Sequence, residues 1–406
     1  MTRTKMQPFG DTISLEQARA VIDGALRRIE RTERVPLEAA DRRVLARDVV
    51  AAADVPPFSR AAMDGYAVRA ADTTGASPAH PVALACIEKV FTGQMPARTV
   101  GAGECTEIAT GAPMPPGADA VVMVEQTSAD GPRVNIFNAA DAGQNIGRQG
   151  ADIKTGQTVL RAGDVLNASR VGAVAALGAE HVDVYARPRV AILSTGNEIT
   201  DPGRPLQPGQ IYDINRFTLA AVIAEHGGVP VPHRTAADTM ADLERALDES
   251  LEDDVLVFSG GTSVGERDLI LDALRNRGEV LFHGISVKPG KPTAFGLVNG
   301  RPFFGMPGYP SSCLLNAHIL LAPALRHVAR LPPHVVKTVT LPLARRVVSA
   351  KDRHQFYTVR VADGMAIPAF KASGDITSMS QADGYFEIAA ATEVVAEGSV
   401  VEVTLF

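Results

Sequence analysis

Between residues 189 and 328 the chain alternates short apolar runs with longer stretches in which apolar residues recur every three or four positions. The apolar runs are typical of strands buried on both faces, and they predict strands over 190–193, 229–231, 255–258 and 280–282. The longer stretches predict helices over 215–226, 240–251, 268–276 and 311–328. Strands that alternate with helices indicate βαβ units, so we expect a parallel sheet covered on both faces. Ligands bind beyond the carboxyl ends of such strands, where the loops 194–198 and 259–265 would lie.

The rest of the chain has a different pattern. Ser14 is a suitable N-cap for a helix over 15–31, where apolar residues recur at helical spacing. Short apolar runs predict strands in three further segments: 56–150, 151–186 and 331–406. The second of these also carries an alanine-rich helix near 168–177, and the last ends in an alternating stretch, 400–405. Because the first helix belongs with neither β region, one domain is expected to be discontinuous in sequence.

The chain has 406 residues, enough for two to four domains at about 150 residues each. Hydrophobic residues make up 46% and charged residues 21%, which is a globular composition and argues against a disordered chain. Lys and Arg number 40 against 46 Asp and Glu, and this net charge of −6 disfavours nucleic acid as a partner. No apolar run approaches the roughly 18 residues of a membrane span, and residues 1–14 lack the apolar stretch of a signal peptide.

The three cysteines, Cys86, Cys105 and Cys313, are far apart in sequence and form no CxxC motif. A disulfide framework and a cysteine-based zinc site are therefore not expected, and a reducing cytoplasm is the expected compartment. The nine histidines show no paired metal-ligand spacing. Gly284 to Thr293 fails as a nucleotide phosphate loop, because Pro292 stands where Ser or Thr is required.

Several loops are suited to anions. Residues 259–265 combine glycines with hydroxyl residues after an apolar strand, so they suit either an anion cradle or a plain turn capped by Asp268. Residues 288–292, Lys-Pro-Gly-Lys-Pro, are either a stiffened oxyanion site or a solvated basic loop. Residues 306–312 precede a helix N-terminus, and Asp64 stands in an Asp-Gly turn. Together with scattered carboxylates, these loops fit a phosphorylated ligand handled with Mg²⁺.

A series of short motifs runs in order along nearly the whole chain. They are Val55–Phe58, Ala62–Val68 (Ala-Met-Asp-Gly-Tyr-Ala-Val), Ile108–Pro115, Gly143–Ile146, Gly150–Ile153, Ser194–Glu198 (Ser-Thr-Gly-Asn-Glu), Gln210–Asn215, Ser259–Asp268, Lys288–Pro292 and Pro307–Pro310. Read together, they closely resemble the molybdopterin molybdenumtransferase family, which comprises the MoeA proteins and the E domain of gephyrin. So many ordered matches make chance negligible.

The resemblance implies a multidomain α/β plus β fold. Its four domains would be a three-layer α/β molybdopterin-binding domain over 1–30 and 180–330, an elongated arm over 31–55 and 150–179, a β-rich second domain over 56–149, and a C-terminal β domain over 331–406. It further implies a homodimer, with each active site between the α/β domain of one subunit and the second domain of the other.

The implied reaction inserts molybdate into a pterin nucleotide, adenylylated molybdopterin. AMP and molybdenum cofactor are then released with the help of Mg²⁺, in the last step of molybdenum cofactor biosynthesis. A molybdopterin adenylyltransferase and recipient molybdoenzymes are candidate protein partners, whereas nucleic acid and membrane are not expected.

The resemblance also assigns residues. The polar residues matched to the family's functional positions are Asp64, Thr110, Asp152, Glu198, Asp238 and Asp268. The pterin and oxyanion pocket would be formed by Ser194, Thr195, Gly196, Asp213, Asn215, Ser259, Gly260, Gly261, Ser263, Lys288, Lys291, Pro307, Pro310, Ser312 and Ser373. Glu198 and Asp268 are the expected Mg²⁺ ligands, because both leave strand ends of one sheet. Lys288, Lys291, Ser312 and Ser373 resemble the molybdate side, and Asp64 would come from the partner subunit.

Some positions depart from the family pattern. Thr262 stands where Val is usual, Tyr309 where Asn is usual, and Gly284 at a position often held by Lys. Thr358 takes the place of an arginine that helps to hold molybdate; Arg353 and Arg360 are candidate replacements, and strand alternation puts Arg360 on the face of Thr358.

Two other functions are weighed. A pterin adenylyltransferase resembles only residues 180–330 and lacks the Met63-Asp64-Gly65 domain, so the length argues against it. A non-catalytic pterin carrier would gain by losing carboxylates near an anionic ligand, and their retention argues against that function.

Overall fold

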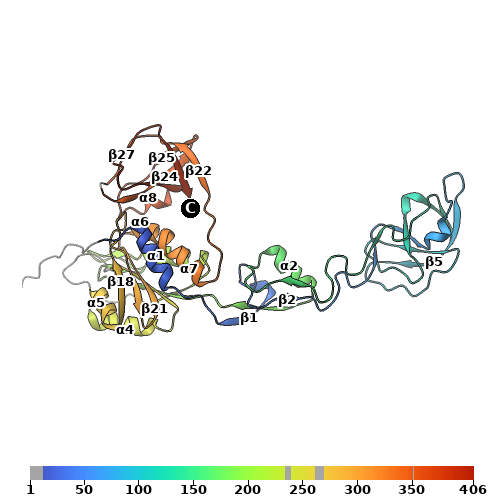
Figure 1. Ribbon diagram of the computed structural model, residues 1–406, viewed down its shortest axis with the longest axis horizontal. Coiled ribbons are helices and arrows are strands. Elements are labelled where there is room, and N and C mark those ends of the chain that lie inside the picture. Colours follow the sequence, from blue (N-terminus) through green and yellow to red (C-terminus); the bar gives the residue numbers. More distant parts are fainter. Residues whose placement is uncertain (1–11, 234–238, 261–268, 351) are drawn as a thin grey trace, which may run out of the picture. The chain divides into compact units, whose positions relative to one another are not determined.

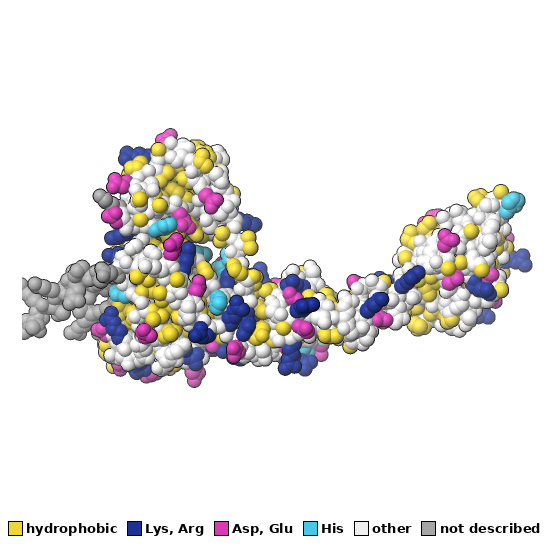
Figure 2. All heavy atoms as spheres, in the orientation of Figure 1, with side chains coloured by type: hydrophobic (Ala, Val, Ile, Leu, Met, Phe, Trp, Pro, Cys, Tyr) yellow, Lys and Arg dark blue, Asp and Glu magenta, His cyan; other side chains and the backbone are white. Residues whose placement is uncertain are grey.

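The computed structural model describes residues 12–233, 239–260, 269–350 and 352–406. The chain forms two compact units, one of residues 34–184 and a larger one of residues 1–33 and 185–406 (Figure 1). Within the described residues, no helix has both the length and the apolar character needed to cross a membrane. On the face drawn in Figure 2, basic and acidic side chains are interspersed with apolar ones.

The larger unit contains a six-stranded sheet with strand order β16-β13-β17-β21-β20-β18. Its strands are β13 (Arg189–Ser194), β16 (Val229–Pro232), β17 (Val255–Ser259), β18 (Gly278–His283), β20 (Ala294–Val298) and β21 (Arg301–Met306). The strands from β16 to β21 pair in parallel, as the sequence predicts, but β20 runs antiparallel to both of its neighbours. The expectation of a wholly parallel sheet is therefore wrong.

The antiparallel strand arises from a hairpin, β20–β21, that the sequence analysis missed. Its two-residue turn is Asn299-Gly300, and both residues have positive φ, 49° and 77°. A turn of this kind needs φ > 0 at both positions, which Asn-Gly adopts more readily than most pairs. The two residues thus reverse the chain with a twist that matches the flanking strands.

Helices cover both faces of this sheet. They are α1 (Leu15–Ala25), α3 (Asn215–Glu225), α4 (Met240–Ser250), α5 (Leu269–Arg277), α6 (Pro310–Asn316), the π-helical η4 (Ala317–Leu321) and α7 (Ala322–Val328). Alternate residues of β13 serve the two faces: Val190 and Ile192 belong to the core with α1, α3, α6 and α7, whereas Ala191 and Leu193 belong to the core with α4 and α5. This is the expected three-layer arrangement.

Two predicted helices have different limits in the structure. Ser14 is the N-cap of α1 as expected, and it forms a capping box with Gln17, but the helix ends at Ala25 rather than residue 31. Leu26 is extended, and the Ile29 N–H donates to the Val328 carbonyl, so burial of Ile29 comes from docking on α7 and not from helical spacing. The predicted helix 311–328 begins one residue earlier, at Pro310, and passes through the π-helical segment before α7.

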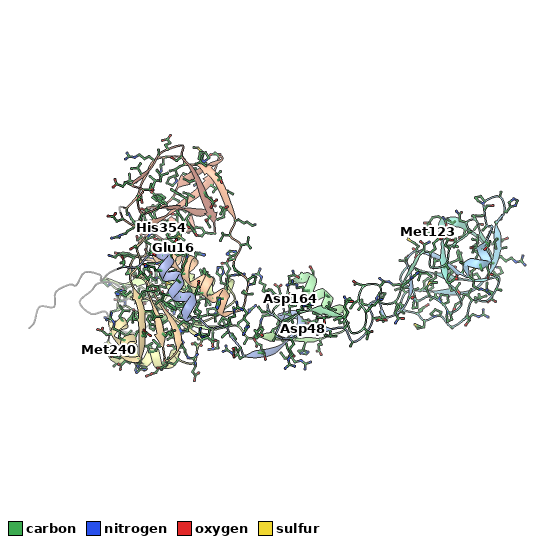
Figure 3. All side chains as sticks on the ribbon, viewed as in Figure 1. Glu16, Asp48, Met123, Asp164, Met240 and His354 are labelled. Atoms are coloured by element: carbon green, nitrogen blue, oxygen red, sulfur yellow. The ribbon has the colours of Figure 1, made fainter. Side chains whose placement is uncertain are left out.

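A second sheet in the larger unit has the order β19-β24-β26-β28-β22, with β25 paired to β24. The elements are β19 (Val287–Lys288), β22 (Thr338–Pro342), β24 (His354–Ala362), β25 (Met365–Pro368), α8 (Thr377–Ser380), β26 (Gly384–Ile388) and β28 (Val400–Leu405), with a ribbon of β23 (Val347–Val348) and β27 (Val394–Val395). β19 pairs in parallel with the start of β24, Val287 with His354 (labelled in Figure 3) and Lys288 with Gln355. The segment that carries Lys288 is therefore an edge strand of the C-terminal sheet.

The smaller unit contains a six-stranded sheet of order β7-β4-β6-β5-β9-β8. Its strands are β4 (Gly65–Val68), β5 (Val82–Val90), β6 (Glu104–Ile108), β7 (Ala120–Met123), β8 (Thr127–Asp130) and β9 (Arg133–Ile136), with short η2 (Ala70–Thr73) and η3 (Val124–Gln126). Apolar side chains pack in two clusters, one containing Tyr66 and Val122 and the other Ala67 and Val121. Since these residues alternate along β4 and β7, the sheet has a core on each face.

The remaining part of the smaller unit has its own apolar cluster. It comprises β1 (Thr32–Pro36), η1 (Leu37–Ala39), β2 (Val49–Val50), β11 (Thr158–Leu160), α2 (Ala168–Ala176) and β12 (His181–Tyr185), and the ribbon of β3 (Arg60–Ala61) and β10 (Ile146–Gly147) follows β2 in the chain. The predicted helix near 168–177 is confirmed as α2. Asp48 and Asp164 belong to this part and Met123 to the six-stranded sheet (Figure 3).

Two of the three cysteines are neighbours in space although they are distant in sequence. Cys86 and Cys105 are paired in register on β5 and β6, and both are free thiols, as is Cys313. Burial raises the pKa of Cys105 to about 12, so its thiol stays protonated at neutral pH. Their proximity follows from strand pairing, which the spacing of the cysteines does not reveal.

Candidate functional site at the carboxyl edge of the sheet

Three parallel strands of the larger unit end at the same level. Ser194 of β13 is in register with Ser259 of β17, which is in register with Met306 of β21. The chain continues from these ends into the segments that begin at Thr195, Gly260 and Pro307. Because the carboxyl ends of parallel strands form one edge, the predicted loop 194–198 and the described residues 259–260 of the other predicted loop lie together there, as expected.

The loops approach one another closely at this edge. Gly260 has φ +98°, and a Cβ on it would lie 2.7 Å from the Thr195 carbonyl oxygen. A Cβ on Gly308 would lie 3.6 Å from the Gly260 Cα. Glycine at position 260 therefore allows both the backbone conformation and the contact between neighbouring loops.

Asn215 connects the beginning of α3 to this edge. Its Nδ2 donates to the Ser259 Oγ at 2.7 Å and to the Gly308 carbonyl oxygen at 2.8 Å. Asp213, two residues earlier, is buried and accepts from the Arg216 N–H at 3.0 Å. The first residue of α3 is thus fixed against the end of β17 and the segment that follows β21.

Several buried polar atoms at this edge lack a hydrogen-bond partner among the described residues. They are Ser194 Oγ, Thr195 Oγ1, Asp213 Oδ2 and Asn215 Oδ1. Each such atom costs of order 1–3 kcal/mol when it is left unpaired away from water. Four of them at one edge leave hydrogen-bonding capacity there that a polar ligand or water can complete.

Glu198 lies beside the loop that follows β13. Its two carboxylate oxygens would be 2.7 Å from a Cβ on Gly196, which has φ +136°, so glycine makes room for the carboxylate. The Glu198 side chain is exposed, and an exposed carboxylate is a ligand that Mg²⁺ prefers. The other predicted ligand, Asp268, lies outside the described residues, as do Asp238, Gly261 and Ser263.

The predicted oxyanion residues come from three segments. Lys288 is held in the C-terminal sheet by β19, and Lys291 follows three residues later. Ser312 is buried in α6, which has Pro310 in its first turn and follows Pro307. Ser373 meets α6 through its carbonyl oxygen, which accepts from the Ser311 Oγ at 2.7 Å. The structure thus joins Ser373 to α6 through Ser311, a residue that the sequence analysis did not assign.

Thr358 is buried in β24, and its Oγ1 has no partner among the described residues. It lies on the same face as Phe356, which belongs to the core shared with the α/β sheet. Arg360 is two residues further along β24, so strand alternation places it on the same face as Thr358. Its side chain is exposed. A hydroxyl therefore occupies the buried position at which the family pattern has an arginine.

Asp64 has a separate setting in the smaller unit. Its Oδ1 accepts from the Thr110 N–H at 2.7 Å and from the Thr110 Oγ1 at 2.9 Å. These two donations, led by the backbone one, hold the pKa of Asp64 below its ordinary value. Gly65 is required next to it, because a Cβ there would lie 1.9 Å from the Val122 carbonyl oxygen. The structure thus brings Asp64 and Thr110 together, as the shared assignment suggested.

Asp152 lies in a loop that the neighbouring Asp54 braces. The Asp54 carboxylate accepts from the Thr155 N–H, the Thr155 Oγ1 and the Gln149 Nε2, each at 2.9 Å. Asp152 itself is exposed, and its N–H donates to the Val55 carbonyl oxygen. Sequence analysis missed Asp54, whose only signal was its position directly before the Val55–Phe58 motif.

Comparison with known proteins identifies three matching sequence families in succession. The MoeA N-terminal region (domain I and II) matches residues 13–178, a probable molybdopterin binding domain matches residues 191–327, and the MoeA C-terminal region (domain IV) matches residues 340–406.

Individual proteins match over most of their length. The chain is 38% identical to molybdopterin molybdenumtransferase 2 of Mycobacterium tuberculosis, over 79% of this chain and 81% of that protein. It is 34% identical to the molybdopterin molybdenumtransferase of Haemophilus influenzae, over 86% of each chain. The crystal structure of a Pyrococcus horikoshii molybdopterin biosynthesis MoeA protein superimposes with a TM-score of 0.84 and 39% identity, over 97% of this chain and 99% of that one.

Proposed function

The chain belongs to the molybdopterin molybdenumtransferase (MoeA) family, and on that premise we propose that it inserts molybdate into adenylylated molybdopterin, with release of AMP. The observation that carries the proposal is the group of buried polar atoms at the end of β13 and the start of α3 that have no hydrogen-bond partner among the described residues. A pterin nucleotide supplies donors and acceptors that match such a surface. This reaction would be the last step of molybdenum cofactor biosynthesis.

The carboxyl edge of the sheet would bind the pterin nucleotide. Asn215 stays fixed by its bonds to Ser259 and Gly308, so its Oδ1 can accept from the ligand without rearrangement. Ser194 and Thr195 offer hydroxyls, and the glycine at 260 brings the loop backbone close enough to contact phosphate. Gly196, Asp213, Gly261, Ser263, Pro307 and Pro310 would complete this pocket.

Glu198 and Asp268 would hold the Mg²⁺ that AMP release requires. Two carboxylates facing a phosphoanhydride would repel it, and a divalent cation between them removes that repulsion. The exposed carboxylate of Glu198 at the end of β13 supports this role. Asp238 is the third carboxylate proposed for this group.

We propose that molybdate binds between the turn that carries Lys288 and Lys291 and the serines Ser312 and Ser373. A tetrahedral dianion needs compensating charge and several donors if its desolvation is to be offset. The two lysines would supply charge, and the hydroxyls of Ser312 and Ser373 would donate to the oxygens. With Thr358 in the place of the usual arginine, Lys288 is expected to carry a larger share of the binding.

We also propose a homodimer in which Asp64, Thr110 and Asp152 act on the substrate bound to the other subunit. The exposed, ionised carboxylate of Asp64, held by Thr110, supports a role toward a second surface. The four-domain boundaries, the cytoplasmic location, and partnership with a molybdopterin adenylyltransferase and with recipient molybdoenzymes belong to the same proposal.

The deciding experiment incubates the purified chain with adenylylated molybdopterin, molybdate and Mg²⁺, and measures AMP together with active cofactor. A transferase releases both, and EDTA or omission of molybdate stops formation of the cofactor. A pterin carrier would retain the nucleotide intact, and an adenylyltransferase would instead consume ATP with unmodified molybdopterin. Either of those results would overturn the proposal.

A further inference from the structure

The turn of residues 288–292, which carries the two predicted oxyanion lysines, is held by hydrogen bonds from a buried side-chain amide. Asn316, the last residue of α6, has no exposed surface. Its Nδ2 donates to the Gly290 carbonyl oxygen at 3.0 Å and to the Thr293 Oγ1 at 2.6 Å. The Thr293 Oγ1 also donates to the Gly290 carbonyl oxygen at 2.8 Å. The Asn316 amide, the Thr293 hydroxyl and the Gly290 carbonyl thus form one hydrogen-bond network inside the turn.

The backbone of the turn is shaped around this amide. Gly290 has φ +103°, and a Cβ built on it would lie 2.2 Å from the Asn316 Nδ2. The space beside Gly290 is therefore filled by the Asn316 side chain. Residues 288–292 and 316 depend on each other: the turn needs glycine to admit the amide, and the amide satisfies the carbonyl that the turn directs inward.

The two ends of this turn are tied to different parts of the unit. Lys288 pairs with Gln355 in the C-terminal sheet, whereas Gly290 and Thr293 are bonded to α6 of the α/β part. Between these anchors the chain carries Lys288 and Lys291. Among the described residues, no carboxylate lies within ion-pair distance of the Lys288 ammonium group, so its charge is available to an anion.

Packing alone gives no reason for an asparagine at position 316. Its Oδ1 is buried and has no partner among the described residues, and burying an unpaired amide oxygen costs stability. An apolar residue of similar volume would avoid that cost but would leave the Thr293 hydroxyl as the one remaining donor, among the described residues, to the Gly290 carbonyl oxygen and would remove the link between the turn and α6. The amide is thus suited to fixing the path of the turn rather than to filling space.

We propose that Asn316 is a positioning residue for the oxyanion site, which sets the distance between Lys288 and Lys291 by holding Gly290 and Thr293. This inference rests on the proposed function, because it takes molybdate to be the anion that the lysines bind. Asn316 has no exposed surface and would act through Gly290 and Thr293, so its effect is expected on molybdate and not on the pterin nucleotide.

The test compares Asn316→Ala and Asn316→Thr with the unaltered full chain. Loss of both donations is expected to raise the molybdate concentration for half-maximal AMP release about tenfold in Asn316→Ala. Asn316→Thr keeps one hydroxyl donor and is expected to show a rise of about threefold. Affinity for adenylylated molybdopterin, titrated without molybdate, is expected to stay within about twofold in both variants.

A matched control removes buried volume elsewhere in the same unit. Leu247→Ala, in α4 on the opposite face of the sheet, destabilises the unit without reaching the turn. It is expected to leave the molybdate requirement unchanged at a temperature where all variants are folded. A similar rise in Leu247→Ala would mean that lost stability, not position, sets the requirement, and the inference would be wrong.

The outcomes separate this inference from the proposed function. If the unaltered chain shows no saturable dependence on molybdate, the proposed function fails before Asn316 is considered. If it does, and both Asn316 variants keep its molybdate requirement, the positioning role is overturned. Loss of pterin affinity in the variants would equally overturn it, because Asn316 would then act on the pterin pocket. Should Asn316→Ala fail to fold, the threefold rise in Asn316→Thr decides the matter.

Discussion

Buried polar atoms with no hydrogen-bond partner among the described residues line the carboxyl edge of the α/β sheet, whereas the exposed Asp64 and the partly exposed Asp54 in the smaller unit accept two and three hydrogen bonds. The first arrangement is costly until a ligand completes it. The second is stable in water by itself and keeps the carboxylates ionised. One region thus has the features of a binding surface, and the other presents fixed negative charge to an incoming group.

The largest expected effect concerns the two carboxylates that are proposed to bind Mg²⁺. Glu198→Gln and Asp268→Asn are expected to fold and to bind adenylylated molybdopterin, but to lose AMP release by about a hundred- to a thousandfold. The amides keep the shape of the side chains and remove the charge that holds Mg²⁺. AMP formation and pterin affinity are measured side by side, with EDTA-treated unaltered protein as the reference. Full turnover by both variants would remove these residues from the metal site.

A second prediction tests whether the two regions act across a dimer. Asp64→Ala and Asp268→Ala are each expected to be inactive, yet mixing equal amounts with subunit exchange should restore about a quarter of the activity. Half of the dimers are then mixed, and each of these has one site that carries neither substitution. Exchange is verified with differently tagged subunits. No recovery despite verified exchange would place both residues in one subunit's site or show that the sites are coupled.

A third prediction concerns the charge on Asp64. Thr110→Val removes the hydroxyl donor and keeps the backbone donor, so the pKa of Asp64 should rise toward its ordinary value. The acid limb of the pH–rate profile is therefore expected to move to higher pH, by about half a unit to one unit. The matched control is Thr92→Val, which removes only the bond to the Thr110 carbonyl. An unmoved acid limb in Thr110→Val would mean that Asp64 does not titrate in the rate-limiting step.

The smallest effect separates the units by their response to acid. Burial lowers the pKa of His226, in the larger unit, from 6.5 to about 4. An unfolded chain then binds one more proton than the folded one between these values, so stability falls as pH drops from 6.5 toward 4. The expected loss is about 2–3 kcal/mol. The lowered pKa values of Asp54 and Asp64 act only at or below about pH 4.

Hydrogen exchange at pH 7 and pH 4.5 measures this difference in each unit. Faster exchange is expected at low pH in α3 and α7 of the larger unit, after correction for the intrinsic rate, and not in the sheet of the smaller one. His226→Leu should remove the part of the pH effect that His226 causes, and His318, whose pKa burial also lowers, contributes in the same direction. If hydrogen exchange in this variant is still faster at pH 4.5, and equally so in both units, then groups other than His226 cause the pH effect.

Most of the α/β fold could be predicted from the sequence, because its strands are continuous apolar runs whose burial on both faces fixes their type. The C-terminal end of α1 could not be predicted in this way. Ile29 is buried at helical spacing, but it lies beyond the helix, where its N–H donates to the Val328 carbonyl oxygen about 300 residues away in the chain. The β20–β21 hairpin had a local signal, Asn299-Gly300, that was not used. Apolar spacing alone does not show this reversal of the chain, whereas the residue types of the turn do.

Only part of the candidate site could be predicted from the sequence, for a similar reason. Ser194, Ser259 and Asn215 follow directly from strand ends and motifs, and the structure brings them together. Asn316 and Asp54 carry no motif of their own, because their partners are 23 to 101 residues away. Such residues are recognised only when the folded chain shows which backbone groups need them.

The pairing of β19 with β24 has a consequence for how the chain can be recombined. A C-terminal domain grafted from a homologue would meet Lys288 through main-chain bonds, which do not depend on side-chain identity. The grafted domain would therefore still pair with β19, but the strand that replaces β24 would determine the register of that pairing. A shift of one residue would turn Lys288 to the opposite face. A chimera joined between α7 and β22 would therefore exchange β24, which pairs with Lys288, and with it a part of the proposed anion site.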